Sequence, residues 1–224
     1  MGGILNDDYI RALLSTAPGS YTAAGARSDA VTLLPVDAEH TAPAQMSDFS
    51  GAMSPDSQKF FTAWKSWRGD RILPRRAQVQ LTSIARLMPQ LVVLEVRGPD
   101  RATFRLAGDD IERAFGLRLT GRSFIRMADE TQQARRGELL WRQVSQPCAV
   151  IMQQEREYRS GRREVVEIAS APVLPDTDGM PVQVFAVVSP LSRQVPPREN
   201  DVVTRNIGRN LRFLDIGAGI PARD

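Results

Sequence analysis

Few side chains in this sequence could carry out covalent chemistry. Cys148 is the only cysteine and His40 the only histidine among 224 residues. A single cysteine allows no internal disulfide and no cluster of thiolate ligands. A single histidine argues against hydrolase triads and against zinc or haem bound by histidines. The sequence therefore predicts no catalytic residues and no metal site.

The lone cysteine has two possible roles. It would be a redox sensor if its thiol were exposed and had a lowered pKa. Because Ala149, Val150 and Ile151 follow Cys148 directly, we expect it to be a small buried core residue instead.

Acidic side chains in the predicted strands give a weak case for an enzyme. These residues are Glu95, Glu155, Glu164 and Glu167. Small isomerases and hydratases use buried carboxylates as acids or bases. Acids that alternate along a strand usually mark its solvated face, so we expect the chain not to be an enzyme.

Two arginine pairs are a weak indication of nucleic-acid binding. They are Arg135-Arg136 and Arg162-Arg163, with Glu138 and Glu164 nearby. Neither pair has interleaved aromatic residues, and the net charge of the chain is a modest +3. We therefore expect no nucleic-acid partner.

An aromatic helix is predicted at residues 54–69. Ser54-Pro55 is a typical helix start and Gly69 a typical end. Its aromatic residues follow helical spacing at Phe60, Trp64 and Trp67. Each contributes about 1.5–3 kcal/mol if fully buried, so the helix must pack against something. Packing on its own domain is favoured over an intermolecular contact.

Five segments have the composition of strands and are separated by turn residues. They are residues 91–96, 103–107, 148–157, 163–171 and 182–189. In the last segment Phe185 and Val187 lie on one face, while the other face is also apolar. A strand that is apolar on both faces needs both faces covered. The domain's own helices would cover one face, and the aromatic helix or a second chain the other.

The order of these elements predicts the fold class. One further long helix is expected at residues 129–146, where Gly137 costs about 1 kcal/mol relative to alanine and must be held by packing. Strands that follow one another through short turns and then a helix indicate an α+β protein. We predict a five-stranded antiparallel sheet with helices on one side, plus the N-terminal flanking aromatic helix.

Composition divides the chain into three parts. Residues 1–53 are rich in small and polar residues and predict a mobile, disordered leader. Residues 54–192 form the domain. Residues 193–224 form a tail in which Val203, Ile207, Leu211 and Leu214 predict an amphipathic helix. No apolar run approaches the roughly 20 residues of a membrane span, so we expect a cytoplasmic protein without stable membrane insertion.

Short motifs in this region resemble those of the PAS domain. A W-x-x-x-R-G and L-P lead-in stands at Trp64, Arg68, Gly69, Leu73 and Pro74. An F-R-L-A-G segment follows at residues 104–108. The likeness covers about residues 58–191 and is greatest to a bacterial family of stand-alone PAS-like proteins. PAS domains bind small ligands or partner proteins and commonly pair through flanking helices.

This resemblance implies a non-catalytic signalling or regulatory module that acts through protein–protein contacts. We expect a protein partner such as a signalling kinase or regulator, and a homodimer. The candidate interface residues are Phe60, Trp64, Trp67, Phe185 and Val187.

A sensor of a small ligand or cofactor is the alternative function. Its pocket would be lined by Phe104, Phe115, Phe124 and Trp141. No cofactor is expected, and an unknown small ligand remains open.

Overall fold

Six antiparallel strands form most of the sheet. The computed structural model describes residues 32–37, 44–45, 53–192 and 201–221. The six strands are β3 (Leu91–Gly98), β4 (Arg101–Ala107), β5 (Cys148–Tyr158), β6 (Arg163–Val173), β7 (Val182–Pro190) and β8 (Val203–Asp215). Two short strands, β1 (Thr32–Asp37) and β2 (Ala44–Gln45), pair with β8 in parallel. The sheet order is β1-β8-β5-β6-β7-β3-β4. The α+β class is confirmed, with one antiparallel strand more than the five predicted.

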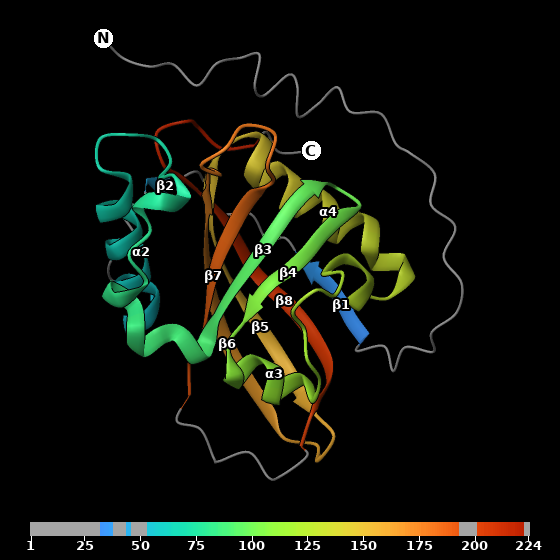
Figure 1. The fold of residues 1–224 in the computed structure, drawn as a ribbon. Coiled ribbons are helices and arrows are strands. Elements are labelled where there is room, and N and C mark those ends of the chain that lie inside the picture. Colours follow the sequence, from blue (N-terminus) through green and yellow to red (C-terminus); the bar gives the residue numbers. More distant parts are fainter. Residues whose placement is uncertain (1–31, 38–43, 46–52, 193–200, 222–224) are drawn as a thin grey trace. The chain divides into compact units, whose positions relative to one another are not determined.

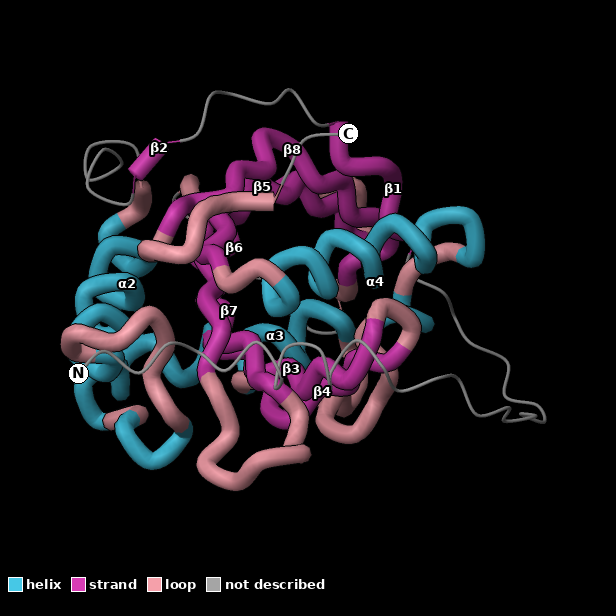
Figure 2. Tube along the Cα trace, turned by 90° about the horizontal axis from the view of Figure 1, so that it is seen from above, coloured by secondary structure: helices cyan, strands magenta, loops and turns pink. Residues whose placement is uncertain are grey.

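Helices lie on both faces of this sheet. The α-helices of the described residues are α2 (Pro55–Arg68), α3 (Asp109–Phe115) and α4 (Glu130–Ser145). Three 3-10 helices accompany them, at Arg76–Gln78 (η2), Leu81–Gln90 (η3) and Ile125–Met127 (η4). Figures 1 and 2 show α2 and α4 on opposite sides of β6 and β7.

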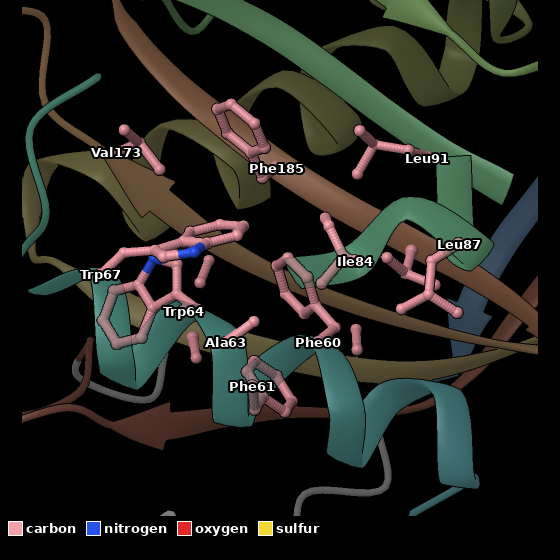
Figure 3. Packing of buried hydrophobic residues seen from close by; sticks show 14 of the residues in the cluster. Phe60, Phe61, Ala63, Trp64, Trp67, Ile84, Leu87, Leu91, Val173 and Phe185 are labelled. Atoms are coloured by element: carbon pink, nitrogen blue, oxygen red, sulfur yellow. The ribbon is translucent and has the colours of Figure 1, made fainter. Parts of the chain in front are cut away.

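The aromatic helix α2 packs on its own domain, as predicted. The side chain of Ser54 accepts a hydrogen bond from the Ser57 N–H at 3.2 Å and so caps the helix start. Trp64 Nε1 donates to the carbonyl oxygen of Pro172 at 3.0 Å, which anchors the helix to β6. Trp67 meets Phe185 of β7 edge to face, with the ring centroids 6.3 Å apart (Figure 3).

The candidate interface residues lie inside this packing. The five candidates Phe60, Trp64, Trp67, Phe185 and Val187 are all less than 5% exposed. They fill one hydrophobic core between α2, η3 and the sheet (Figure 3). Both covers of the two-faced strand therefore come from the same chain, and these residues offer no surface to a partner.

The lead-in motif fixes α2 to the far end of the chain. Arg68 Nη1 donates to the carbonyl oxygen of Ile216 at 2.6 Å, just beyond β8. The same guanidinium lies 5.4 Å from the centroid of the Trp64 ring. Gly69 ends the helix with a φ of 55°, in the region that favours glycine. The motif is structural: its residues join α2 to the sheet.

The tail forms strand β8, so the predicted amphipathic helix is wrong. A spacing of four residues places Val203 and Ile207 on one side of a helix and equally on one side of a strand. The strand prevails because β5 supplies a full antiparallel partner along it. Asn210, with a φ of 52°, lies where the pairing register shifts, at a bulge.

Part of the predicted leader is also ordered in strands. Residues 32–37 and 44–45 form β1 and β2, which corrects the prediction of disorder there. They add to the edge of β8 that β5 leaves open. Met53 is buried in the core beside α2. The other residues of the leader lie outside the described residues.

Packing holds α4 at Gly137, as predicted. A Cβ atom on this residue would overlap with the carbonyl oxygen of Pro99, in the turn between β3 and β4. The absence of a side chain therefore lets the helix approach the turn closely.

We predict that Gly137→Ala lowers the free energy of unfolding by about 1–3 kcal/mol, because overpacking outweighs the helical preference for alanine. Urea unfolding followed by circular dichroism measures the change. Thr131→Ala, on the exposed side of the same helix, is the matched control and should be nearly neutral. A Gly137→Ala protein as stable as the wild type would contradict the close contact.

Cys148 is fully buried, which confirms that it is a core residue. Burial, with a smaller effect of the Asp215 carboxylate, raises the pKa of its thiol from 9.0 to about 12. The thiolate, the reactive form, is therefore scarce in the folded protein near neutral pH.

Stability should consequently fall between pH 9 and pH 12. In this range the unfolded chain loses the thiol proton while the folded chain keeps it, so rising pH favours unfolding. Cys148→Ala lacks this group and should lose less stability over the same range, as measured by urea unfolding at each pH. Parallel curves for the two proteins would show that the thiol does not titrate as described.

Candidate functional site

A cavity of about 210 Å³ lies between the sheet and the helices on the face opposite α2. Its floor consists of alternate residues of the strands, because successive side chains of a strand point to opposite faces. These floor residues are Val92, Leu94, Val150, Met152, Gln154, Arg156, Ile168, Ser170, Val184, Ala186, Val188, Asn206, Gly208, Leu211 and Phe213. Their neighbours Val93, Ile151 and Val187 belong to the opposite core under α2.

The bulge in β8 gives this strand its share of the floor. Asn206 and Gly208 line the cavity before Asn210, and Leu211 and Phe213 line it after. The extra residue at the bulge changes which side chains face inward. The strand thus continues the apolar floor opposite Val150, which pairs with Phe213.

The roof is built from β4, the short helices and α4. Its lining residues are Phe104, Ile111, Phe115, Phe124, Met127, Ala128, Gln132, Arg135, Arg136, Leu139, Leu140 and Gln143. Phe104 and Phe124 meet edge to face with their centroids 5.5 Å apart. The lining residues of α4 recur at helical spacing, so one face of this helix faces the cavity.

Arg136 is the polar group that stands out in this roof. Its guanidinium carbon lies 3.6 Å from the centroid of the Phe124 ring, a close cation–π contact. Its Nη1 atom is shielded from solvent and has no hydrogen-bond partner. Burial lowers the pKa of Arg136 to about 9, so the side chain remains a cation at neutral pH.

Arg156, at the α3 end of the cavity, has more polar neighbours than Arg136. Its Nε donates to Gln154 Oε1 at 3.2 Å. Burial lowers the pKa of Arg156, while nearby Tyr158 and Glu164 act in the opposite direction. Tyr158 donates a hydrogen bond to Glu164 at 2.6 Å, which forms a buried polar group beside this arginine.

Two buried amides complete the polar lining. Gln143 Nε2 donates to Ser170 Oγ at 3.0 Å, which joins α4 to the centre of the sheet. Asn206 is 1% exposed, and its Oδ1 has no hydrogen-bond partner. The cavity therefore combines an apolar interior with a few fixed polar groups, the usual composition of a small-molecule site.

The structure brings three of the four predicted pocket residues together. Phe104, Phe115 and Phe124 line the cavity, whereas Trp141 is absent from its lining. Trp141 follows Leu140 and precedes Gln143, both of which do line it, so it lies beside the inward face of α4.

The arginines of the cavity were missed as site residues. Arg136 was noticed only as part of a basic pair. A signal was present in the sequence, because Gln132, Arg136 and Leu140 are spaced by four residues and share one helix face. In the other basic pair, Arg162 does not line the cavity and lies 3.6 Å from carboxylate oxygens of both Glu164 and Asp201.

The four strand carboxylates are all engaged elsewhere. Glu95 and Glu155 form ion pairs with Arg105 and Arg209. Glu164 accepts from Tyr158, and Glu167 accepts from the Ser54 N–H at 2.7 Å at the start of α2. None of them belongs to the cavity lining.

Comparison with known proteins agrees with this architecture. A family model described as PAS domain matches residues 52–188, more than half of the chain. The match spans α2 and the strands from β3 to β7. It ends two residues before the end of β7 and does not include β8. No curated protein matches the chain. Among the helices that the structure describes, none has the length and apolar character required to cross a membrane.

Proposed function

Because the chain belongs to the PAS domain family, we propose that it is a sensor module whose input is a small, largely apolar molecule. The observation that carries the proposal is the cavity of about 210 Å³ under α4. The sheet is solidly packed against α2 on one face, yet the other face retains open space. Well-packed interiors leave few voids larger than a water molecule, so a space of this size favours a binding site.

Ligand binding is better supported than recognition of a partner through the aromatic helix. The residues that would have formed that interface are buried against the sheet. A kinase or regulator, or a second copy of this chain, would have to bind through other residues. These partners remain predictions. They would receive the signal from the module, whereas the small molecule would be the signal that it senses.

The proposal assigns no catalytic role. A reaction at the cavity would need an acid, base or nucleophile among its lining residues. Within the described part of the chain the polar lining holds arginines, amides and the Ser170 hydroxyl, which is hydrogen-bonded to Gln143, with no carboxylate, cysteine or histidine that could act as its base. These groups suit binding and orientation of a ligand.

Partial filling of the cavity should weaken ligand binding. We predict that the neutral probe 3-phenylpropionamide binds the wild type and that Ala186→Leu weakens binding roughly tenfold or more, by occupying the floor. Isothermal titration calorimetry measures both affinities, and circular dichroism confirms that the variant folds. Met180→Leu, at a residue that is 49% exposed, is the control.

Two results would count against a sensor with an internal ligand. One is equal affinity of the wild type and Ala186→Leu, which would place the probe outside the cavity. The other is absence of any probe binding, together with native mass spectra of freshly isolated protein that show no retained molecule.

A further inference from the structure

We propose that the ligand of this cavity carries a carboxylate group and that Arg136 is the residue that binds it. The inference rests on the proposed function, because it names the chemical class of the sensed molecule. Its starting point is a half-buried cation whose Nη1 atom is shielded from solvent, with an open space beside it and no acid among the described residues that line that space.

One nitrogen of the Arg136 guanidinium lacks the acceptor that a shielded N–H donor normally has. Arginine carries five N–H donors and cannot accept hydrogen bonds, so its donors need oxygen atoms nearby. Its Nη1 is out of contact with solvent and donates to nothing in the described protein. The guanidinium instead contacts the face of the Phe124 ring. An aromatic ring attracts a cation but accepts no conventional hydrogen bond.

The energies indicate that this contact alone does not balance the burial. A cation–π contact is a weak attraction compared with a charged hydrogen bond. Removal of part of a cation from water is costly in proteins unless an opposite charge and hydrogen bonds compensate. An anionic group in the cavity would supply both.

Charge is one-sided throughout the lining. Three arginines line the cavity, and the described residues contribute no acid to it. Arg156 has Tyr158 and Glu164 beside it, and Arg135 is exposed at the surface. Among these three, Arg136 is thus the arginine with a solvent-shielded Nη1 that has no hydrogen-bond partner and with no acid of the lining beside it.

A single carboxylate fits this environment better than a phosphate. Carboxylates pair with guanidinium through two parallel hydrogen bonds, and the ring of Phe124 holds the guanidinium plane in place. Gln132 lies one helical turn before Arg136 and also lines the cavity, where its amide can donate to the second oxygen. A dianionic phosphate would need more countercharge than one unpaired arginine, in a space whose other walls are apolar.

The test uses the full-length protein and compares two probes of nearly the same shape, a carboxylate and the corresponding neutral amide, which has an N–H donor in place of one oxygen. We predict that 3-phenylpropionate binds the wild type at least about tenfold more tightly than 3-phenylpropionamide, as expected for a charged hydrogen-bonded pair. Arg136→Gln should remove this preference, because it weakens the binding of 3-phenylpropionate and leaves the binding of 3-phenylpropionamide unchanged. Arg136→Lys should retain part of it, since the charge stays while the bidentate geometry is lost.

Arg126→Gln is the matched control for these titrations. It makes the same change in net charge at an exposed residue that does not line the cavity. Its preference for the carboxylate should equal that of the wild type. If Arg126→Gln retains the preference for the carboxylate and Arg136→Gln loses it, the preference depends on a local contact and not on the net charge of the protein.

The outcomes distinguish this inference from the proposed function. If both probes bind the wild type equally and Ala186→Leu blocks both, the cavity is a ligand site but the carboxylate inference is overturned. If the preference persists in Arg136→Gln, another residue holds the anion and the assignment of Arg136 is wrong. If neither probe binds, this inference fails, and the retained-ligand spectra decide the proposed function separately.

Discussion

The structure depends on a sheet that is apolar on both faces. The β-strands place Val93, Phe185 and Val187 on one side and Val92, Val184 and Ala186 on the other. Such a sheet is stable only if each face is removed from water. The two faces are covered in different ways, and this difference separates the structural half of the molecule from the half with a cavity.

On the α2 face the cover is dense and anchored. Two tryptophans and two phenylalanines fill the space, and polar contacts fix the helix at both ends: Ser54 with Glu167, and Arg68 with Ile216. On the α4 face the cover rests on a few close contacts, such as Gly137 against Pro99 and Gln143 with Ser170. Helix α4 thus stands over open space, with Arg136 directed at an aromatic ring rather than at an acid.

Local patterns in the sequence were sufficient to predict much of this arrangement. Ser54-Pro55 and Gly69 gave the limits of α2, and turn residues separated the five strands of the domain. The aromatic stripe showed that α2 must be buried, but burial by itself does not name the covering surface. The aromatic residues of α2 were therefore also candidates for an interface, whereas in the structure the sheet of the same chain covers them.

The errors have a common physical origin in long-range pairing. Residues 203–215 have a four-residue spacing that fits a helix or a strand, and only the edge of β5, some 50 residues away, decides between them. Similarly, Arg136 resembles any surface arginine until the tertiary structure places the Phe124 ring against it. Three phenylalanines of the cavity were predicted because large apolar side chains suggest an interior. For Arg136 the helical spacing with Gln132 and Leu140 indicates an inward face, but arginine is mostly exposed in proteins, so the spacing alone does not predict its contact with the ring.

The central claim is that a ligand occupies the space under α4 with its charged end at Arg136. A crystal structure of the protein with 3-(4-bromophenyl)propionate tests this most directly, since anomalous scattering locates the bromine atom without ambiguity. The account predicts bromine among the apolar residues of the floor and the carboxylate within hydrogen-bond distance of the Arg136 guanidinium. Bromine at the molecular surface, with the cavity closed by the protein's own side chains, would contradict it.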